Sequence, residues 1–225
     1  MGDNQKPLTI YHPRDDLYLA DMKLYLERTS KRLPFALSWV PLDANEVFAL
    51  SGKRRVQTFP TRHIEGRLTV GYHILETRRR LKPEYSSLPE SEIRVRSQSG
   101  GRAAIEELME TYEAKIASFG GDGLPLEPTA VEATELLIHE ATILDAADRK
   151  GERHSTLDEA VTVAAQARAG VLLLNHVSGR YEKSQVERAA QQSALRHNFQ
   201  SPVWCLFHNR LWNIATSAKA ARETK

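Results

Sequence analysis

The sequence contains a single cysteine, Cys205, which excludes an internal disulfide and a zinc site built from several cysteines. Its formal net charge is only +2, so no basic field covers the whole surface. No apolar run approaches the roughly 20 residues of a membrane-spanning helix. Residues 1–6 are polar, so we expect no secretory signal. These absences favour a cytoplasmic location and no membrane partner.

What the chain does contain is an α/β pattern. With 225 residues and 41% hydrophobic content, it can bury the core of one domain, or of a large part of one. The apolar runs that begin at Leu136 and at Val171 are typical of buried parallel strands, and 155–169 between them predicts a helix that stops at Gly170. Each of these segments lies next to a histidine.

His139 and His176 lie where the two predicted strands end, and His154 lies at the predicted helix start. Ligands of open α/β sheets gather beyond the carboxyl ends of their strands. One histidine at a strand end is more often structural than functional. Three of them at one edge of one sheet indicate a metal site or an acid–base site.

The residues around these histidines form specific sequence motifs. Residues 139–142 read HEAT, 154–156 read HST and 176–181 read HVSGRY. Together they resemble the C-terminal half of ribonuclease Z, the metallo-β-lactamase-fold enzyme that trims tRNA 3′ ends. The segments PLTIY at 7–11 and GYHI at 71–74 are also similar to that family. The resemblance implies an αββα-sandwich type of α/β fold.

The resemblance also implies roles for individual residues. His63, Asp122 and His176 match zinc ligands, with Asp122 as the bridge between two ions. His154 matches a proton donor or phosphate stabiliser, Glu140 would orient a histidine beside it, and His139 and Thr142 would support the ligands. Without the resemblance, His63 reads as a solvent-facing turn residue and 120–123 (GGDG) as an ordinary tight turn. Gly123 replaces the threonine usual in the family.

One family motif, HxHxDH, occurs nowhere in the sequence. In the family it precedes the PLTIY-like segment and supplies two ligands to each of two zinc ions. Here each zinc would keep one histidine and the shared aspartate, so we expect the chain alone to bind no zinc or one ion weakly. The first strands would be missing as well. We therefore expect an unpaired edge or an uncovered apolar face near 7–11, a surface that favours a homodimer.

The interval 77–118 interrupts the strand pattern within what we expect to be one partial domain spanning 1–225. It matches the position of the family's tRNA-binding arm, although its residues do not match the Gly-Pro-rich motif of that arm. Its basic cluster contains Arg78, Arg79, Arg80 and Lys82, which we expect to contact RNA such as a pre-tRNA. We predict a helix at 103–117 in this interval, further helices at 15–33 and 183–196, and a polar tail at 215–225.

Three interpretations remain open. The chain is a ribonuclease Z-like zinc hydrolase whose first segment is absent from this sequence, or a non-catalytic member of that family that binds RNA or a protein. It could equally be a related metallo-β-lactamase-fold hydrolase with another substrate, because a fold does not fix a substrate.

Overall fold

The computed structural model describes residues 6–14, 16–29, 33, 35–151 and 153–214. Its largest unit is an eight-stranded sheet of order β10-β9-β8-β7-β6-β5-β4-β3. The strands of this sheet are β3 (Val47–Ser51), β4 (Arg54–Thr61), β5 (Thr69–Leu81), β6 (Met109–Phe119), β7 (Leu136–Glu140), β8 (Val171–Asn175), β9 (Val203–Phe207) and β10 (Arg210–Ile214). Strands β6 to β9 run parallel to one another, and the remaining neighbours are antiparallel.

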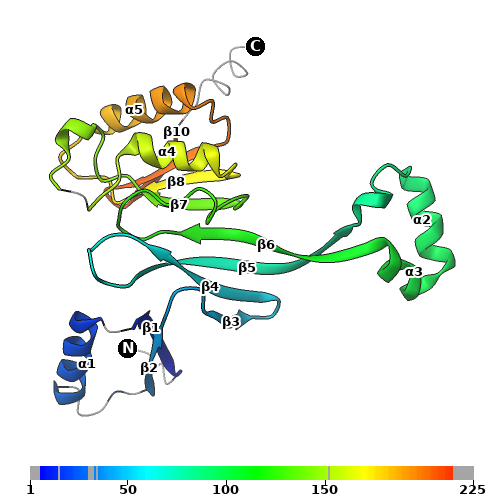
Figure 1. Cartoon of the computed structure of the whole chain (residues 1–225), viewed down its shortest axis with the longest axis horizontal. Coiled ribbons are helices and arrows are strands. Elements are labelled where there is room, and N and C mark those ends of the chain that lie inside the picture. Colours follow the sequence, from blue (N-terminus) through cyan, green and yellow to red (C-terminus); the bar gives the residue numbers. More distant parts are fainter. Residues whose placement is uncertain (1–5, 15, 30–32, 34, 152, 215–225) are drawn as a thin grey trace.

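The core lies between the parallel strands and the helices α4 (Leu157–Gln166) and α5 (Lys183–Arg196), which cover one face of the sheet (Figure 1). Leu137, Leu172 and Leu174 of β7 and β8 are fully buried, as expected for strands covered by helices. Helix α4 begins at a capping box in which Thr156 and Glu159 satisfy each other's backbone N–H groups. The two predicted strands and the predicted helix at 183–196 are therefore confirmed.

An arm formed by the long strands β5 and β6 extends away from this core (Figure 1). At its far end lie η1 (Pro83–Tyr85), α2 (Glu90–Ser99) and α3 (Gly101–Leu108). The predicted helix at 103–117 is wrong beyond Leu108, because the chain continues from there as β6. In this segment hydrogen bonding to β5 outweighs local helix propensity, and Thr111, Tyr112 and Ile116 suit a strand.

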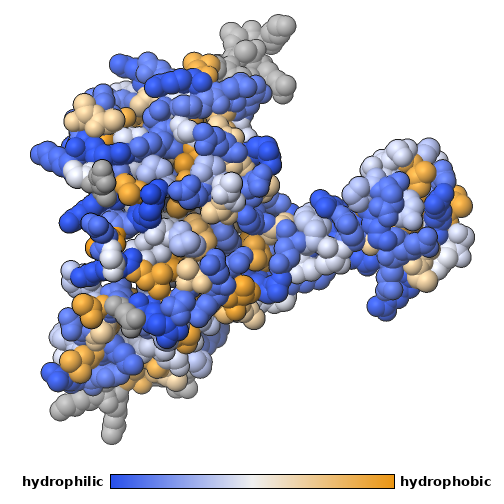
Figure 2. Space-filling model, in the orientation of Figure 1, coloured by the Kyte–Doolittle hydropathy of each residue, from blue (hydrophilic) through white to orange (hydrophobic). Residues whose placement is uncertain are grey.

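The N-terminal part forms a separate two-stranded parallel sheet of β1 (Leu8–Pro13) and β2 (Leu37–Leu42), connected by α1 (Leu17–Thr29). Large apolar side chains are exposed here, and Figure 2 shows orange patches over this part, at lower left. They are Leu8, Tyr11, Leu17, Tyr18, Met22, Leu24 and Tyr25, with Val47 and Leu50 on the edge strand β3. Among the described residues, this agrees with the predicted open edge and uncovered apolar face.

Two remaining predictions concern the ends of the chain and the membrane. The predicted polar tail at 215–225 lies outside the described residues. Within the described ranges, none of the helices has both the length and the apolar composition needed to cross a bilayer.

Candidate metal and acid–base site

Four side chains that are far apart in the sequence meet at the carboxyl-end edge of the sheet. His63 follows β4, Asp122 follows β6, His176 follows β8, and His154 precedes α4. The rings of His63 and His154 lie 5.2 Å apart, and those of His154 and His176 lie 5.4 Å apart. Nε2 of His176 lies 3.2 Å from Oδ2 of Asp122. The structure thus brings His154 and His176, which the sequence placed at one sheet edge, together with His63 and Asp122, which the resemblance assigned to zinc.

The Glu140 carboxylate lies at the centre of this group and is 1% exposed. Oε1 accepts the N–H of Gly123 and Nδ1–H of His154, both at 2.9 Å. Oε2 accepts the N–H of Thr142 at 2.9 Å and its hydroxyl at 2.6 Å. Burial pushes the pKa of Glu140 upward, but the hydrogen bonds that it accepts outweigh burial and hold the pKa below its usual range. The carboxylate is therefore charged at neutral pH.

This charged hub fixes the tautomers of two histidines. The Thr142 hydroxyl gives its only proton to Glu140, so it must accept Nδ1–H of His176, at 2.7 Å. His154 likewise donates Nδ1–H to Glu140. Each ring therefore keeps Nε2 for chemistry, which is the orientation that hydrogen bonding at the other nitrogen imposes on metal-binding histidines.

His63 is fixed in the same way by a different acceptor. Its Nδ1 lies 2.9 Å from the backbone carbonyl oxygen of Arg153. A carbonyl can only accept, so Nδ1 carries the proton and Nε2 keeps its lone pair. All three histidines thus share one tautomer, although their partners are a carboxylate, a hydroxyl and a carbonyl.

The pair His176 and Asp122 has the spacing of two ligands on one metal ion. Two donors about 2.0 Å from a tetrahedral zinc lie about 3.3 Å apart, close to the 3.2 Å observed here. His176 adopts a left-handed backbone, with φ of 54°, which a residue with a side chain rarely does. Such strain concentrates at functional sites, and here it accompanies the turn of the chain out of β8.

A second grouping of donors also meets the requirement for a metal. Glu140, His154 and His176 each place one donor atom within 4.8 Å of the others. The Glu140 oxygens, however, already accept four hydrogen bonds, so a metal there would displace some of them. This triad therefore fits proton handling better, and the Nε2 side of His176 fits a metal better.

The loop that carries Asp122 is held by contacts that the sequence did not predict. Gly123 has a φ of 159°, and a Cβ there would lie 2.5 Å from the carbonyl oxygen of Arg62. This close approach leaves no room for a side chain at position 123. The Ser155 hydroxyl donates to the Gly123 carbonyl at 2.8 Å. Local sequence gives no signal for either contact, because both join distant segments.

His139 supports the same loop from below. It is 2% exposed, donates Nδ1–H to its neighbour's carbonyl at 2.7 Å, and accepts the N–H of Leu126 at Nε2, at 3.3 Å. Burial lowers the pKa of His139, so the ring is neutral. Both ring nitrogens are occupied, so His139 has no atom left to bind a metal.

Two of the four cations in the basic cluster of the arm have carboxylate partners, whereas Arg79 and Lys82 have none among the described residues. Arg78 pairs with Glu76 and Glu135, and Arg80 pairs with Glu110. Arg79 is exposed and has no carboxylate partner among the described residues. The cluster therefore presents less free positive charge than its sequence indicates.

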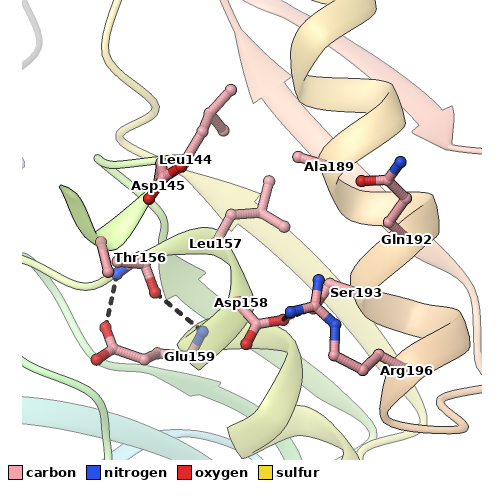
Figure 3. Close-up of a pocket in the computed structure, with 11 residues that line it drawn as sticks. Leu144, Asp145, Thr156, Leu157, Asp158, Glu159, Ala189, Gln192, Ser193 and Arg196 are labelled. Carbon is pink, nitrogen blue, oxygen red and sulfur yellow. Dashed lines mark hydrogen bonds and ion pairs between the residues drawn. The ribbon is translucent and has the colours of Figure 1, made fainter. Parts of the chain in front are cut away.

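A separate cavity of about 540 Å³ lies between α4, α5 and the loop before α4 (Figure 3). Its polar groups mainly pair with one another. The Asp158 carboxylate accepts the Ser193 hydroxyl at 2.6 Å and lies 3.7 Å from the Arg196 guanidinium. These contacts join α4 to α5 and lie outside the histidine group.

Comparison with known proteins agrees with the geometry. Ribonuclease Z of Halobacterium salinarum is 28% identical over 211 residues, which are 85% of this chain and 67% of that protein. Ribonuclease Z of Methanocaldococcus jannaschii is 37% identical over 87 residues, which are 36% of this chain and 27% of that protein. The chain thus spans between about a quarter and two thirds of the length of these relatives. No protein-family model matches it.

Solved structures show the same fold. The metallo-β-lactamase-fold protein YhfI from Bacillus subtilis superposes with a TM-score of 0.57 at 17% identity, covering 94% of this chain and 66% of that one. The short form of human tRNase Z superposes with a TM-score of 0.54 at 19% identity, covering 93% of this chain and 68% of that one. At these identities the match concerns the fold.

Proposed function

Because the chain is a ribonuclease Z-like protein with the metallo-β-lactamase fold, we propose that its site serves metal-dependent hydrolysis of a phosphodiester bond in RNA. The substrate class would be that of tRNA 3′ processing, with a pre-tRNA-like RNA as partner. One observation carries the proposal: three histidines in one tautomer lie at one rim, and Nε2 of one of them faces an aspartate at ligand spacing.

The donor set fits zinc. Two imidazole nitrogens and a carboxylate, from His63, His176 and Asp122, are ligands that catalytic zinc takes. Bound there, the ion would lower the pKa of a water molecule to about 7 and so provide a hydroxide nucleophile. The family holds two ions, whereas His176 and Asp122 supply two ligands of one ion here, and His63 does not join them in a group of three donors within 4.8 Å. We therefore propose at most one weakly held zinc ion for this chain.

The residues around the metal would handle the proton. His154 keeps Nδ1–H on the Glu140 carboxylate, so Nε2–H of the protonated ring can be given to the oxygen that leaves phosphorus. The hydrogen bond to Glu140 holds that ring in place. Glu140 thereby acts through His154. Thr142 donates its hydroxyl proton to Glu140 and accepts Nδ1–H of His176, so it fixes the tautomer of His176 as well.

Further features of the proposal concern partners and location. Arg79, with Arg78, Arg80 and Lys82 beside it, would contact RNA at the base of the arm. The exposed apolar N-terminal surface would join two copies into a homodimer. A cytoplasmic location suits the one cysteine, Cys205, which is buried.

A second function is favoured by the small number of donors. With ligands for only one ion, the chain could bind RNA without cleaving it, as a non-catalytic family member. The two functions differ in whether zinc addition produces cleavage of a bound RNA.

The test is cleavage of a pre-tRNA, and of bis(p-nitrophenyl) phosphate, by chain supplied with zinc. We expect His154→Ala to lower the rate by roughly 10²- to 10⁴-fold, the usual contribution of a proton donor, and to leave the zinc content unchanged. His12→Ala, which removes a histidine from β1, is the matched control and should keep the wild-type rate. Loss of zinc in His154→Ala would contradict the proton-donor role. RNA binding without cleavage would favour the second function, and cleavage of the small ester alone would indicate another substrate.

A further inference from the structure

A hollow of about 670 Å³ lies next to His63. It is lined by residues 61–67, Leu124 and Arg153. Three guanidinium groups, from Arg62, Arg67 and Arg153, contribute positive charge to this lining, and Glu65 is the one carboxylate among the described residues that line it. The hollow is therefore a basic cleft, in a chain whose overall charge is nearly balanced.

Backbone contacts attach the cleft directly to the site. The Arg153 carbonyl that borders it accepts Nδ1–H of His63. The Arg62 carbonyl accepts the N–H of Leu124 at 2.7 Å, immediately after the loop that carries Asp122. A group bound in the cleft would consequently lie beside the histidines.

The guanidinium groups of the cleft are available to a ligand. Arg62 has only a 3.3 Å pair with Glu127, and both side chains are at least 65% exposed, so this pair is weak. Arg67 lies over the Tyr18 ring, at 5.0 Å, which orients the guanidinium and leaves its N–H edge free of carboxylates. Arg153 has no carboxylate partner within the described part of the chain.

The arm provides the contrast. Arg78, Arg80 and Arg96 each have a closer glutamate partner than Arg62 has, so a phosphate approaching them would have to displace a carboxylate. The glutamate pairs of Arg94 and Arg102 are as exposed as that of Arg62 and similarly weak. Among the described residues, Arg79 and Lys82 of the arm have no carboxylate partner, whereas Arg67 and Arg153 lie together in one cleft beside the histidines.

We infer that the cleft binds backbone phosphates of an RNA strand next to the bond held at the histidines, with Arg67 and Arg153 as the main contacts. Forked guanidinium donors match the geometry of phosphate oxygens. The cleft continues the site on the side of His63. An RNA strand extends beyond the phosphate that reacts, so its neighbouring phosphates need such an adjoining surface. The choice of RNA rests on the proposed function, whereas phosphate recognition rests on the cleft alone.

The test is the binding of a short fluorescein-labelled single-stranded RNA, measured by anisotropy with chelator present and with sodium chloride from about 50 to about 200 mM. Each phosphate contact to a single strand contributes about 0.7 to the salt slope, which equals about fivefold in affinity at 0.1 M salt. We expect Arg67→Gln/Arg153→Gln to weaken binding about 25-fold and to make the slope shallower by about 1.4. Both side chains are exposed, so the variant should fold normally.

Arg94→Gln/Arg96→Gln, which removes the same charge at the tip of the arm, is the matched control and should bind RNA like the wild type. Wild-type affinity and slope in the cleft variant would overturn the inference, as would an equal loss in the control. Displacement of the RNA by a few millimolar inorganic phosphate would overturn the assignment to a strand. Because the chelator removes metal, a failure to hydrolyse esters leaves this measurement unaffected and counts only against the proposed function.

Discussion

Replacing Glu140 with glutamine should destabilise the protein far more than the loss of one surface charge would. The glutamine has one accepting oxygen and one NH₂ group where the carboxylate has two oxygens. Each Glu140 oxygen accepts one backbone N–H, which cannot move, and one group that can rotate or change tautomer. Whichever way the amide lies, a buried backbone donor, of Gly123 or of Thr142, loses its acceptor.

The magnitude follows from these bonds. A buried donor without a partner costs about 1–3 kcal/mol, and each remaining bond loses roughly 1 kcal/mol when its acceptor is no longer charged. We expect Glu140→Gln to lower the free energy of unfolding by about 3 kcal/mol. Glu113→Gln, which removes an exposed carboxylate paired with Arg55, should change it by less than about 0.5 kcal/mol.

Urea denaturation at pH 7 measures the stability, and nitrogen NMR of the imidazole rings measures the tautomers. In the wild type we expect Nδ1–H on both His154 and His176. In Glu140→Gln one of the two rings should change tautomer, according to which side the NH₂ group faces. A variant as stable as the wild type, with unchanged tautomers, would refute the idea of a charged hub.

Two further predictions concern the surroundings of the site. Burial lowers the pKa of His73 to about 4, so acid protonates the unfolded chain first and stability falls as the pH drops from about 6.5 towards 4. Between pH 7 and 4.5 this loss is about 2 kcal/mol, and urea denaturation should show it in the wild type but not in His73→Gln; parallel pH profiles would contradict it. Gly123→Ala should destabilise by about 2 kcal/mol or more and weaken zinc binding, because its Cβ would meet the Arg62 carbonyl. Gly121→Ala, with φ of 68° and open space around it, should cost only about 1 kcal/mol, so equal effects in the two variants would exclude the steric explanation.

The sequence predicted the parallel half of the sheet well. Leu136 to Ile138 and Val171 to Leu174 are apolar on both faces, which favours strands covered on their faces, and α5 has the expected bounds. The arm was predicted less well. Residues 109–117 carry no decisive periodicity, and their strand conformation comes from pairing with β5, which lies far away in the sequence. Similarly, the basic residues at 78–82 gave no indication of the glutamates that form ion pairs with Arg78 and Arg80.

For the candidate site, the sequence by itself singled out His139, His154 and His176, because the motifs around them are specific and lie at the ends of strands and at a helix start. Only the tertiary structure decided what those residues do. His139 became a neutral, buried support, and Glu140 became a charged acceptor that sets the tautomers of two rings. Hydrogen bonds and desolvation set a side chain's proton state, and both depend on groups that the fold, rather than neighbouring sequence, brings into contact.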